Sequence, residues 1–388
     1  MPQKSIYILV CVLLAMSVRA APGVPVSPRL TAPIVGIDTA AQDRILLYDT
    51  SGTARAIRFD GAWVRFWGFS SDGCRILYTQ RDAIAPGRLF SARLDGSDRR
   101  PLAQYAGSES WGVWEPSWSP AAAIPRIAFT LIRDRGTGGR DALTHHIALV
   151  DATGGIVSPY SVSGDEHTVR WSPDGRWLVY AAYDERAAGS GVFATAAPGQ
   201  TATSVREADL WIVSADGTTK YRLTDFPTGS VSMPRWSPDG DLIGFVYAAS
   251  PGVDTVWMIG REPGSAPTQI TYAAALLLDL TWAPDGAALV LSARGLNGVS
   301  ENRLWRVGLT GGADANAVQV IADPTLGYHD YPRYSADGQW LALRSEYGLA
   351  LVDESGVWRW LERGALGNAP PVWTPASFTG EGACTDAT

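Results

Sequence analysis

The stretch Trp171-Ser172-Pro173-Asp174-Gly175 recurs along the 388-residue chain and decides its fold. Two copies keep the same pattern, at Trp236-Ser237-Pro238-Asp239-Gly240 and Trp282-Ala283-Pro284-Asp285-Gly286. Four looser copies begin at Phe69, Trp118, Tyr334 and Trp373. Counted from the second residue of each copy, the steps are 49, 53, 65, 46, 52 and 39 residues. A phrase repeated at a period of about fifty indicates one supersecondary unit copied along the chain.

Each copy carries a second landmark, such as Leu210-Trp211-Ile212-Val213 followed by Asp216-Gly217. A glycine stands at the matching place in six of the seven copies: Gly52, Gly96, Gly154, Gly217, Gly311 and Gly356. Short strands separated by Asp-Gly turns form hairpins, and the spacing accommodates four strands per unit. Four-stranded units repeated around an axis form a β-propeller. We therefore predict an all-β, seven-bladed propeller with four-stranded antiparallel blades, and a six-bladed ring as the alternative.

The two ends of the chain complement each other. Strands are expected at residues 34–37, 45–48 and 54–59, but no copy of the phrase precedes them. The last copy, Trp373-Thr374-Pro375, has no strands after it. Together they make one blade, so we predict a ring closed by N- and C-terminal strands that share a blade. The propeller domain would span residues 30–376, with a C-terminal tail at 377–388.

Residues 1–20 have the pattern of a secretory signal peptide. Lys4 supplies a positive charge, residues 6–16 are an apolar run, and Val18 and Ala20 place small side chains where signal peptidase cleaves. The run is shorter than the roughly 20 apolar residues that span a bilayer. We therefore expect a protein exported to the periplasm or the extracellular space. The alternative is a segment that is kept as an uncleaved anchor.

The composition limits the classes of partner that the protein can bind. The net charge is −7 and the 32 Lys and Arg residues are scattered, so there is no basic patch for nucleic acid or for a membrane surface. A monomer is expected.

Cys74 and Cys384 remain after the signal segment and form either a disulfide, as exported proteins allow, or two unpaired thiols.

At this point the repeats resemble a known family. The Trp-Ser-Pro-Asp-Gly phrase, the continuation Asp-Leu-Trp-Ile-Val-Ser-Ala-Asp-Gly at 209–217 and the closing Arg-Leu-Thr at 222–224 look like the repeats of TolB-type, WD-like propellers. Such repeats also occur in the propeller domains of prolyl-oligopeptidase and dipeptidyl-peptidase enzymes and in oligogalacturonate lyases. The resemblance covers essentially the whole chain after residue 20. It implies the fold, whereas one fold hosts many activities.

Strand direction predicts where a site would lie. The Asp-Gly turns share one end of the ring, the bottom face, and the longer variable connections share the other, the top face. Functional residues concentrate on loops that a rigid scaffold holds. The residues that enter the first strand of a unit from above are the predicted partner contacts: Trp111, Trp114, Glu115, Asp165, Glu166, His167, Asp279, His329, Asp330 and Tyr331. The alternative is a solvated rim whose polar side chains only cap loops.

Catalytic motifs are missing from the sequence. It contains no Gly-x-Ser-x-Gly nucleophile elbow, no phosphate-binding loop and no dinucleotide fingerprint. The repeated Arg170, Arg235 and Arg333 are expected to pair with acidic neighbours or to stack on Trp between blades; the alternative is that they present positive charge to an anionic ligand. With only four His residues, we expect no catalytic residue, no metal and no cofactor. We predict a non-catalytic binding module for a protein, peptide or glycan; the alternative is a polysaccharide lyase or hydrolase with a site at the channel mouth.

Overall fold

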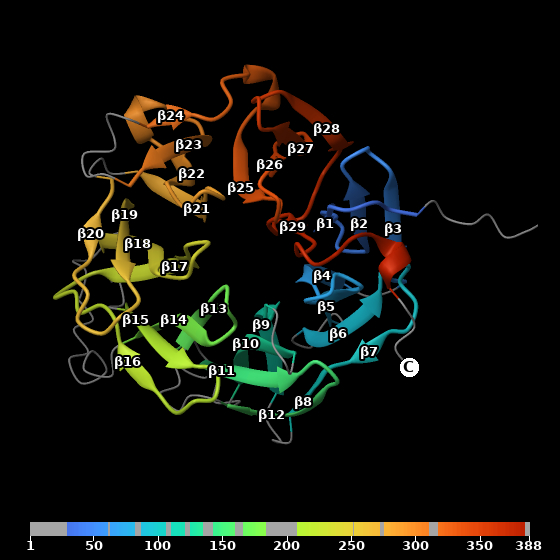
Figure 1. Cartoon of the computed structure of the whole chain (residues 1–388), viewed down its shortest axis with the longest axis horizontal. Helices are drawn as coiled ribbons and strands as arrows, with labels where there is room; N and C mark the ends of the chain where they lie inside the picture. The colour runs from blue at the N-terminus through green and yellow to red at the C-terminus, as the bar shows by residue number, and fades with distance from the viewer. Residues whose placement is uncertain are drawn as a thin grey trace, which may run out of the picture.

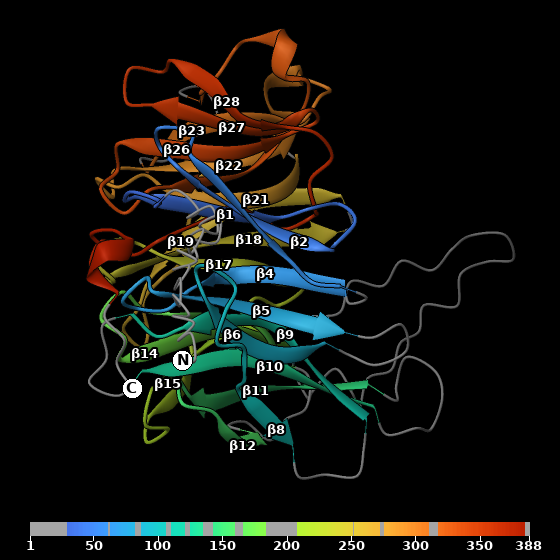
Figure 2. The same ribbon diagram turned by 90° about the vertical axis from the view of Figure 1, so that its right-hand side faces the viewer.

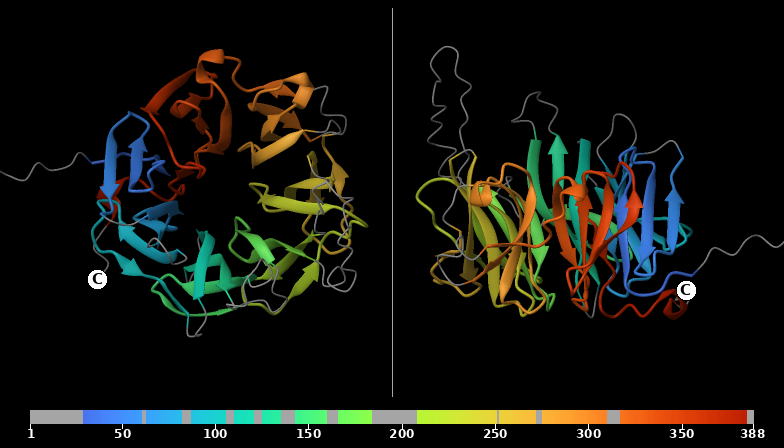
Figure 3. Two further views of the ribbon diagram at one scale, coloured as in Figure 1. Left: turned by 180° about the vertical axis from the view of Figure 1, so that it is seen from behind. Right: turned by 90° about the horizontal axis from the view of Figure 1, so that it is seen from above.

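The computed structural model describes residues 29–60, 63–81, 87–105, 110–120, 125–134, 143–159, 166–183, 208–250, 252–271, 275–309 and 317–384. Its strands stand in sheets around a central axis (Figure 1). They run nearly along that axis, as the side views in Figure 2 and Figure 3 show. The predicted all-β propeller is therefore confirmed. The predicted signal segment, residues 1–20, lies outside the described residues.

Five sheets contain four or five strands each. The closing sheet contains β29 (Val372–Trp373), β1 (Ile34–Asp38), β2 (Arg44–Asp49) and β3 (Ala54–Arg58). The second contains β4 (Trp63–Phe69), β5 (Arg75–Arg81), β6 (Arg88–Arg93) and β7 (Arg100–Pro101). The third contains β9 (Ser110–Trp118), β10 (Arg126–Asp134), β11 (Leu143–Asp151), β12 (Gly155–Pro159) and β8 (Ala103–Tyr105). Two more contain β21 (Leu276–Trp282), β22 (Ala288–Arg294), β23 (Arg303–Gly308) and β24 (Val318–Gln319), and β25 (His329–Tyr334), β26 (Trp340–Ser345), β27 (Gly348–Asp353) and β28 (Trp358–Arg363).

A sixth sheet has eight strands. It contains β13 (Glu166–Trp171), β14 (Trp177–Tyr183), β15 (Ala208–Ser214), β16 (Lys220–Arg222), β17 (Ser230–Trp236), β18 (Leu242–Ser250), β19 (Val253–Gly260) and β20 (Thr268–Gln269). One parallel pairing, between Ala208 and Ser230, joins its two halves, and in the third sheet β8 pairs in parallel with β12. The structure therefore corrects both predicted arrangements, since the sheets are neither seven nor six equal four-stranded blades.

Short 3-10 helices lie at Leu296–Gly298 (η2), Pro324–Leu326 (η4) and Glu381–Ala383 (η5). No helix in the described part of the chain is long and apolar enough to cross a membrane. The core lies between neighbouring sheets. Because both faces of a sheet pack on a neighbour, the middle strands are apolar throughout, as in β22, where six of seven residues are buried.

The repeated phrase builds the turn between the first two strands of a unit. Ser172 Oγ donates a hydrogen bond of 2.5 Å to Asp174 Oδ1, and the Trp177 N–H donates one of 2.9 Å to Ser172 Oγ. Gly175 has a φ of 67°, which favours glycine. The same pair of bonds recurs where the copies carry Ser70, Ser237 and Ser335. The phrase is therefore scaffold, and its turns form the bottom face.

The repeated Trp joins neighbouring units. The indole Nε1–H of Trp236 donates 3.1 Å to the carbonyl oxygen of Arg170, and that of Trp282 donates 2.9 Å to the carbonyl oxygen of Arg235. Two equivalent bonds run from Trp171 to Ser117 and from Trp373 to Arg333. Each indole thus packs between two neighbouring units of the ring and satisfies its only donor on the next unit.

The ring closes through the predicted shared sheet. β29 pairs with β1 in an antiparallel register that sets Val35 opposite Trp373. The Ile34 N–H donates 3.0 Å to Thr374 Oγ1, and the Thr374 N–H donates 2.8 Å to the Ile34 carbonyl oxygen. The last copy of the phrase therefore supplies the innermost strand to the sheet that holds the first described strands.

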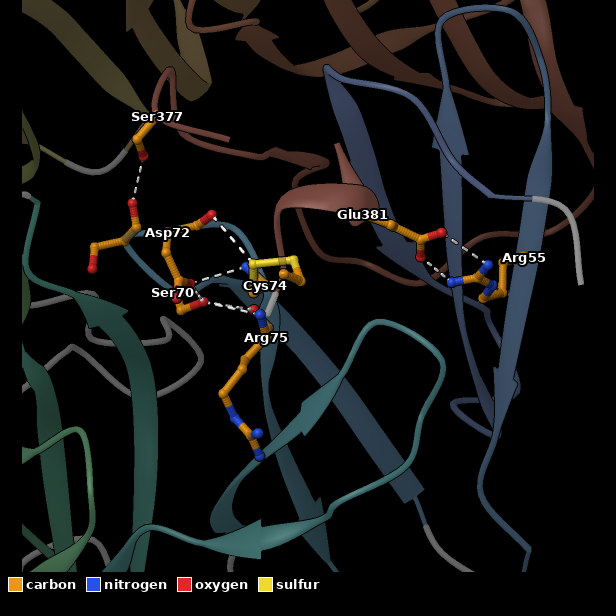
Figure 4. Close-up of a disulfide and its surroundings, with 9 residues drawn as sticks. Arg55, Ser70, Asp72, Cys74, Arg75, Ser377 and Glu381 are labelled. Atoms are coloured by element: carbon orange, nitrogen blue, oxygen red, sulfur yellow. Dashed lines mark hydrogen bonds and ion pairs between the residues drawn. A yellow bond between two sulfur atoms is a disulfide. The ribbon is translucent and has the colours of Figure 1, made fainter. Parts of the chain in front are cut away.

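The tail after β29 is fastened to the bottom face (Figure 4). Cys384 forms a disulfide with Cys74, which is the first of the two alternatives that the sequence left open. Glu381 forms an ion pair with Arg55, with 3.1 Å between Arg55 Nη2 and Glu381 Oε2. Phe378 is buried, and its ring occupies the place that a Cβ at position 73 would need. Residues 377–384 thus lie at the opposite end of the ring from the top face.

Candidate functional site

A cleft of about 620 Å³ opens on the top face, where three consecutive sheets meet beside the ring closure. Its walls come from the β1–β2 connection, the beginning of β4, the end of β5, β9, β10 and the segment before β29. The described residues that line it are Ala40, Gln42, Trp63, Val64, Arg65, Thr79, Arg81, Gly87, Gly112, Val113, Trp114, Ile132, Leu366, Gly367 and Asn368. The closure of the ring therefore creates the site, since residues near both ends of the chain contribute to it.

Two exposed indoles dominate the cleft. Trp63 is 45% exposed and Trp114 is 42% exposed, although Trp is usually well buried. Trp63 begins β4, and Trp114 lies in β9 opposite Thr130. Glu115, directly after Trp114, has a φ of 49° and lies where the β9–β10 register shifts. Such a bulge turns the strand locally and re-aims its side chains.

An arginine side chain lies over the ring of each exposed indole. The guanidinium carbon of Arg81 lies 4.6 Å from the ring centroid of Trp63. The guanidinium carbon of Arg65 lies 4.9 Å from the ring centroids of both Trp67 and Trp114. Cation–π contacts of this kind hold a guanidinium plane in place.

The cleft is positively charged. Its described lining contains two arginines and no carboxylate. Arg65 Nη2 donates 3.0 Å to the carbonyl oxygen of Asn368, which is a neutral acceptor. Within the described residues, neither Arg65 nor Arg81 forms an ion pair. A positive cleft on a chain of net charge −7 indicates a site for an anionic group.

A buried carboxyl group lies next to this cleft. Asp38 is 1% exposed, and its Oδ2 accepts a hydrogen bond of 3.2 Å from the Phe66 N–H. Its Oδ1 has no hydrogen-bond partner in the described part of the chain. A Cβ at position 367 would lie 1.9 Å from this oxygen, so only glycine fits there. Burial raises the pKa of Asp38 to about 6, and the Phe66 hydrogen bond and Arg65 limit the rise.

Most predicted contact residues lie outside the cleft. Trp114 lines it, whereas Trp111 is buried, with the Arg88 guanidinium 4.1 Å from its ring centroid. Glu166 is fully buried, with an oxygen 3.9 Å from Lys220 Nζ. His167 stacks on Tyr183 with 5.0 Å between ring centroids. Asp165 lies outside the described residues.

The remaining predicted acids form ion pairs between the innermost strands. Glu115 accepts 2.6 Å from Arg170. Asp279 bridges Arg235 at 2.9 Å and Arg333 at 2.6 Å. Burial would raise the pKa of Asp279, but the charges of Arg333 and Arg235 outweigh it and lower the pKa. The predicted pairing of the repeated arginines is thus confirmed, and these groups compensate one another.

The predicted residues at the start of β25 are also enclosed. His329 is fully buried, and neither ring nitrogen has a hydrogen-bond partner among the described residues. Burial lowers the pKa of His329 to about 4. Asp330 pairs with Arg344 at 2.5 Å, and the same guanidinium lies 4.9 Å from the Tyr331 ring. His329 therefore has no exposed surface to offer a partner.

Sequence reasoning missed Trp63, Arg65 and Arg81. A usable signal was present, since Arg65 stands four residues before Phe69 just as Trp114 stands four residues before Trp118. Taking the residue four positions before the aromatic of the first copy would have identified Arg65. In the described part of the chain, no three His, Cys, Asp or Glu side chains gather as metal ligands would.

Comparison with known proteins gives a fold and no assigned family. No family model matches the chain. Over 232 residues the chain is 27% identical to a Bacillus subtilis (strain 168) protein named uncharacterized peptidase YuxL. The match covers 59% of this chain and 29% of that protein, so the chain spans less than a third of the length of this curated relative.

Solved structures share the propeller. A puromycin hydrolase matches with a TM-score of 0.62 and 15% identity, over 89% of this chain and 55% of that chain. An oligogalacturonate lyase in complex with manganese matches with a TM-score of 0.55 and 14% identity, over 81% and 84%. TolB from Acinetobacter baumannii is also similar, with a TM-score of 0.49 and 16% identity over 88% and 82%. At 15% and 14% identity, the first two of these likenesses show the propeller fold alone.

Proposed function

We propose that the chain is a non-catalytic binding module that holds a protein partner on its top face. The observation that supports this most is the placement of exposed apolar side chains. Eight large hydrophobic residues of the described chain are exposed. Six of them lie toward the top face, within β9 or at and next to the top ends of other strands: Trp63, Trp114, Val253, Leu276, Tyr328 and Tyr347. The other two, Val318 and Val357, lie on an outer strand and at a bottom turn.

A protein surface suits this arrangement better than a small ligand does. Leu276 begins β21 and Tyr347 lies between β26 and β27, so the apolar residues continue well beyond the cleft. Protein interfaces are enriched in Trp, Tyr and Arg and take most of their binding energy from a few such anchors. The bottom face is occupied by turns and by the fastened tail. Only the top face therefore offers anchors of this kind in the described structure.

We further propose that the protein is exported to the periplasm or the extracellular space. Disulfides persist in oxidising compartments and are rare in the cytosol. The Cys74–Cys384 bond joins residues 310 positions apart and fastens the end of the ring. Together with the signal-like residues 1–20, this bond supports export.

A capture experiment with matched surface variants tests the proposed function. Wild-type protein, a top-face variant (Leu276→Ser with Tyr347→Ser) and a control variant (Val318→Ser with Val357→Ser) are immobilised and exposed to native extracellular extract. We expect a protein that the wild type and the control retain and the top-face variant releases, with equal melting temperatures. Equal retention by all three, or cleavage of the retained protein, would contradict a non-catalytic top-face module.

A further inference from the structure

The two cleft arginines differ from every arginine of the inner ring. Arg170, Arg235, Arg333 and Arg344 each have a carboxylate within ion-pair distance. Arg65 and Arg81 have none in the described part of the chain, although both stand at the mouth of a cleft. Since the fold supplies acids to balance its structural arginines, these two charges are left for a group that comes from outside.

Their geometry suits a carboxylate. The guanidinium groups of Arg81 and Arg65 lie over the rings of Trp63 and Trp114, and cation–π contacts do not use up their N–H donors. Arg65 already donates from Nη2 to Asn368 and its Nε is buried, so Arg81 offers the more accessible donors. A carboxylate binds to the edge of a guanidinium group in its plane and accepts two hydrogen bonds. The exposed faces and edges of the two indoles remain available for apolar groups next to the carboxylates.

The size of the cleft and its surroundings point to a peptide segment. A cleft of about 620 Å³ suits a ligand of a few residues. Tyr347 is a further exposed aromatic side chain on the same face outside the cleft, which suits an occupant that belongs to a larger apolar partner. A short acidic stretch with interspersed apolar side chains matches both features.

We propose that the cleft is the anchor site for an acidic peptide segment of the partner, in which Arg65 and Arg81 bind carboxylates and Trp63 and Trp114 pack against apolar side chains. This inference rests on the proposed function and specifies the chemistry of the same face. No bond is made or broken; the interaction is an exchange of solvent for charge-assisted hydrogen bonds.

A labelled octapeptide tests the proposal by fluorescence anisotropy. The probe has the sequence Gly-Asp-Leu-Glu-Trp-Asp-Leu-Glu, and its neutral counterpart carries Asn and Gln in place of the acids and an amidated end. We expect the acidic probe to bind about tenfold or more tightly than the neutral one, and to weaken at high salt. Equal binding of the two probes would overturn the proposal.

Variants at matched positions locate the binding. Arg81→Gln should weaken binding of the acidic probe about tenfold, because it removes one of the two charges that bind carboxylates. Arg81 is exposed, so its loss leaves the fold intact. Arg363→Gln is the control: Arg363 is exposed and stacks on Trp360 at 5.3 Å, but it lies on β28 outside the cleft. Arg65→Lys, which keeps the charge of a half-buried side chain, should weaken binding less than Arg81→Gln does. Equal effects of Arg81→Gln and Arg363→Gln would refute the assignment.

Two outcomes separate this inference from the proposed function. If the partner found by top-face capture binds Arg81→Gln as strongly as wild type, the acidic-segment proposal fails while the binding module stands. If a trisaccharide of uronic acids binds more tightly than the acidic peptide and depends equally on Arg81, the occupant is a carbohydrate and the peptide assignment is wrong. Loss of capture with Arg81→Gln, together with weak trisaccharide binding, supports the proposal.

Discussion

Replacing Asp38 with Asn should stabilise the folded protein at neutral pH, with a gain that disappears in acid. Asp38 is buried beside the top-face cleft, and its Oδ1 has no hydrogen-bond partner in the described structure. Burial raises its pKa from 3.8 to about 6. Asn has the same shape, keeps an acceptor for the Phe66 N–H and carries no charge.

The sign and size of the effect follow from proton binding. Between pH 3.8 and about pH 6 the folded protein keeps the proton on Asp38, whereas the unfolded chain releases it. The folded state therefore binds more protons in this range, and its stability falls as the pH rises. A pKa difference of about two units corresponds to roughly 3 kcal/mol, which is the full penalty above pH 6.

Urea unfolding of wild type and Asp38→Asn at several pH values from 4 to 8 measures this penalty. The difference in unfolding free energy should grow by roughly 3 kcal/mol across the series and level off above pH 6, at a constant dependence on urea. Other titrating groups are the same in both proteins and cancel in the difference. Asp241→Asn, a change of an exposed Asp, is the control. A difference that does not vary with pH, or one that falls as the pH rises, would refute the reasoning.

Three further perturbations test other parts of the structure. His329→Gln should reduce the acid sensitivity of the protein. Burial lowers the pKa of His329 from 6.5 to about 4, so wild-type stability is complete above pH 6.5 and decreases by roughly 3 kcal/mol as the pH falls to 4. Urea unfolding at both pH values measures this decrease, and an equal decrease in the variant would count against burial of His329 as its cause. Cys384→Ser should lower the unfolding free energy by about 2–5 kcal/mol under oxidising conditions only; a loss that persists against reduced wild type would assign it to packing. Asp279→Asn should destabilise by about 3–5 kcal/mol, because two half-buried arginines lose their buried carboxylate; a melting temperature equal to that of wild type would show that the pairs are not needed.

The sequence predicted the turns and the propeller well because the residues that form each turn are close together in the sequence. The bonds within Ser172–Trp177 lie inside one short stretch, and the repeated Trp occupies equivalent positions, so periodicity was sufficient to predict the turns and the propeller. The grouping into sheets was not predictable in this way. The larger sheet depends on a single contact between Ala208 and Ser230, where two units approach in space.

The cleft was predicted less well, since its walls are distant in sequence. Gln42 and Asn368 lie on opposite ends of the chain and meet only when the ring closes. The sequence also predicted exposed contacts wherever polar residues begin an innermost strand. Asp279 and His329 follow that pattern, but the first is enclosed by arginines and the second is fully buried. Position in a repeat does not reveal which polar groups the neighbouring sheets cover.

The shared closing sheet sets an order in which the protein can acquire its structure. β1, β2 and β3 precede the other described strands in the chain, yet the strand that completes their sheet ends at Trp373. Until then one edge of β1 has unpaired N–H and C=O groups, and exposed edges of this kind invite pairing with other chains. An emerging chain therefore carries an open β-edge from the synthesis of β1 until that of β29. Only its last described residues remove that edge and then fasten it with a covalent bond.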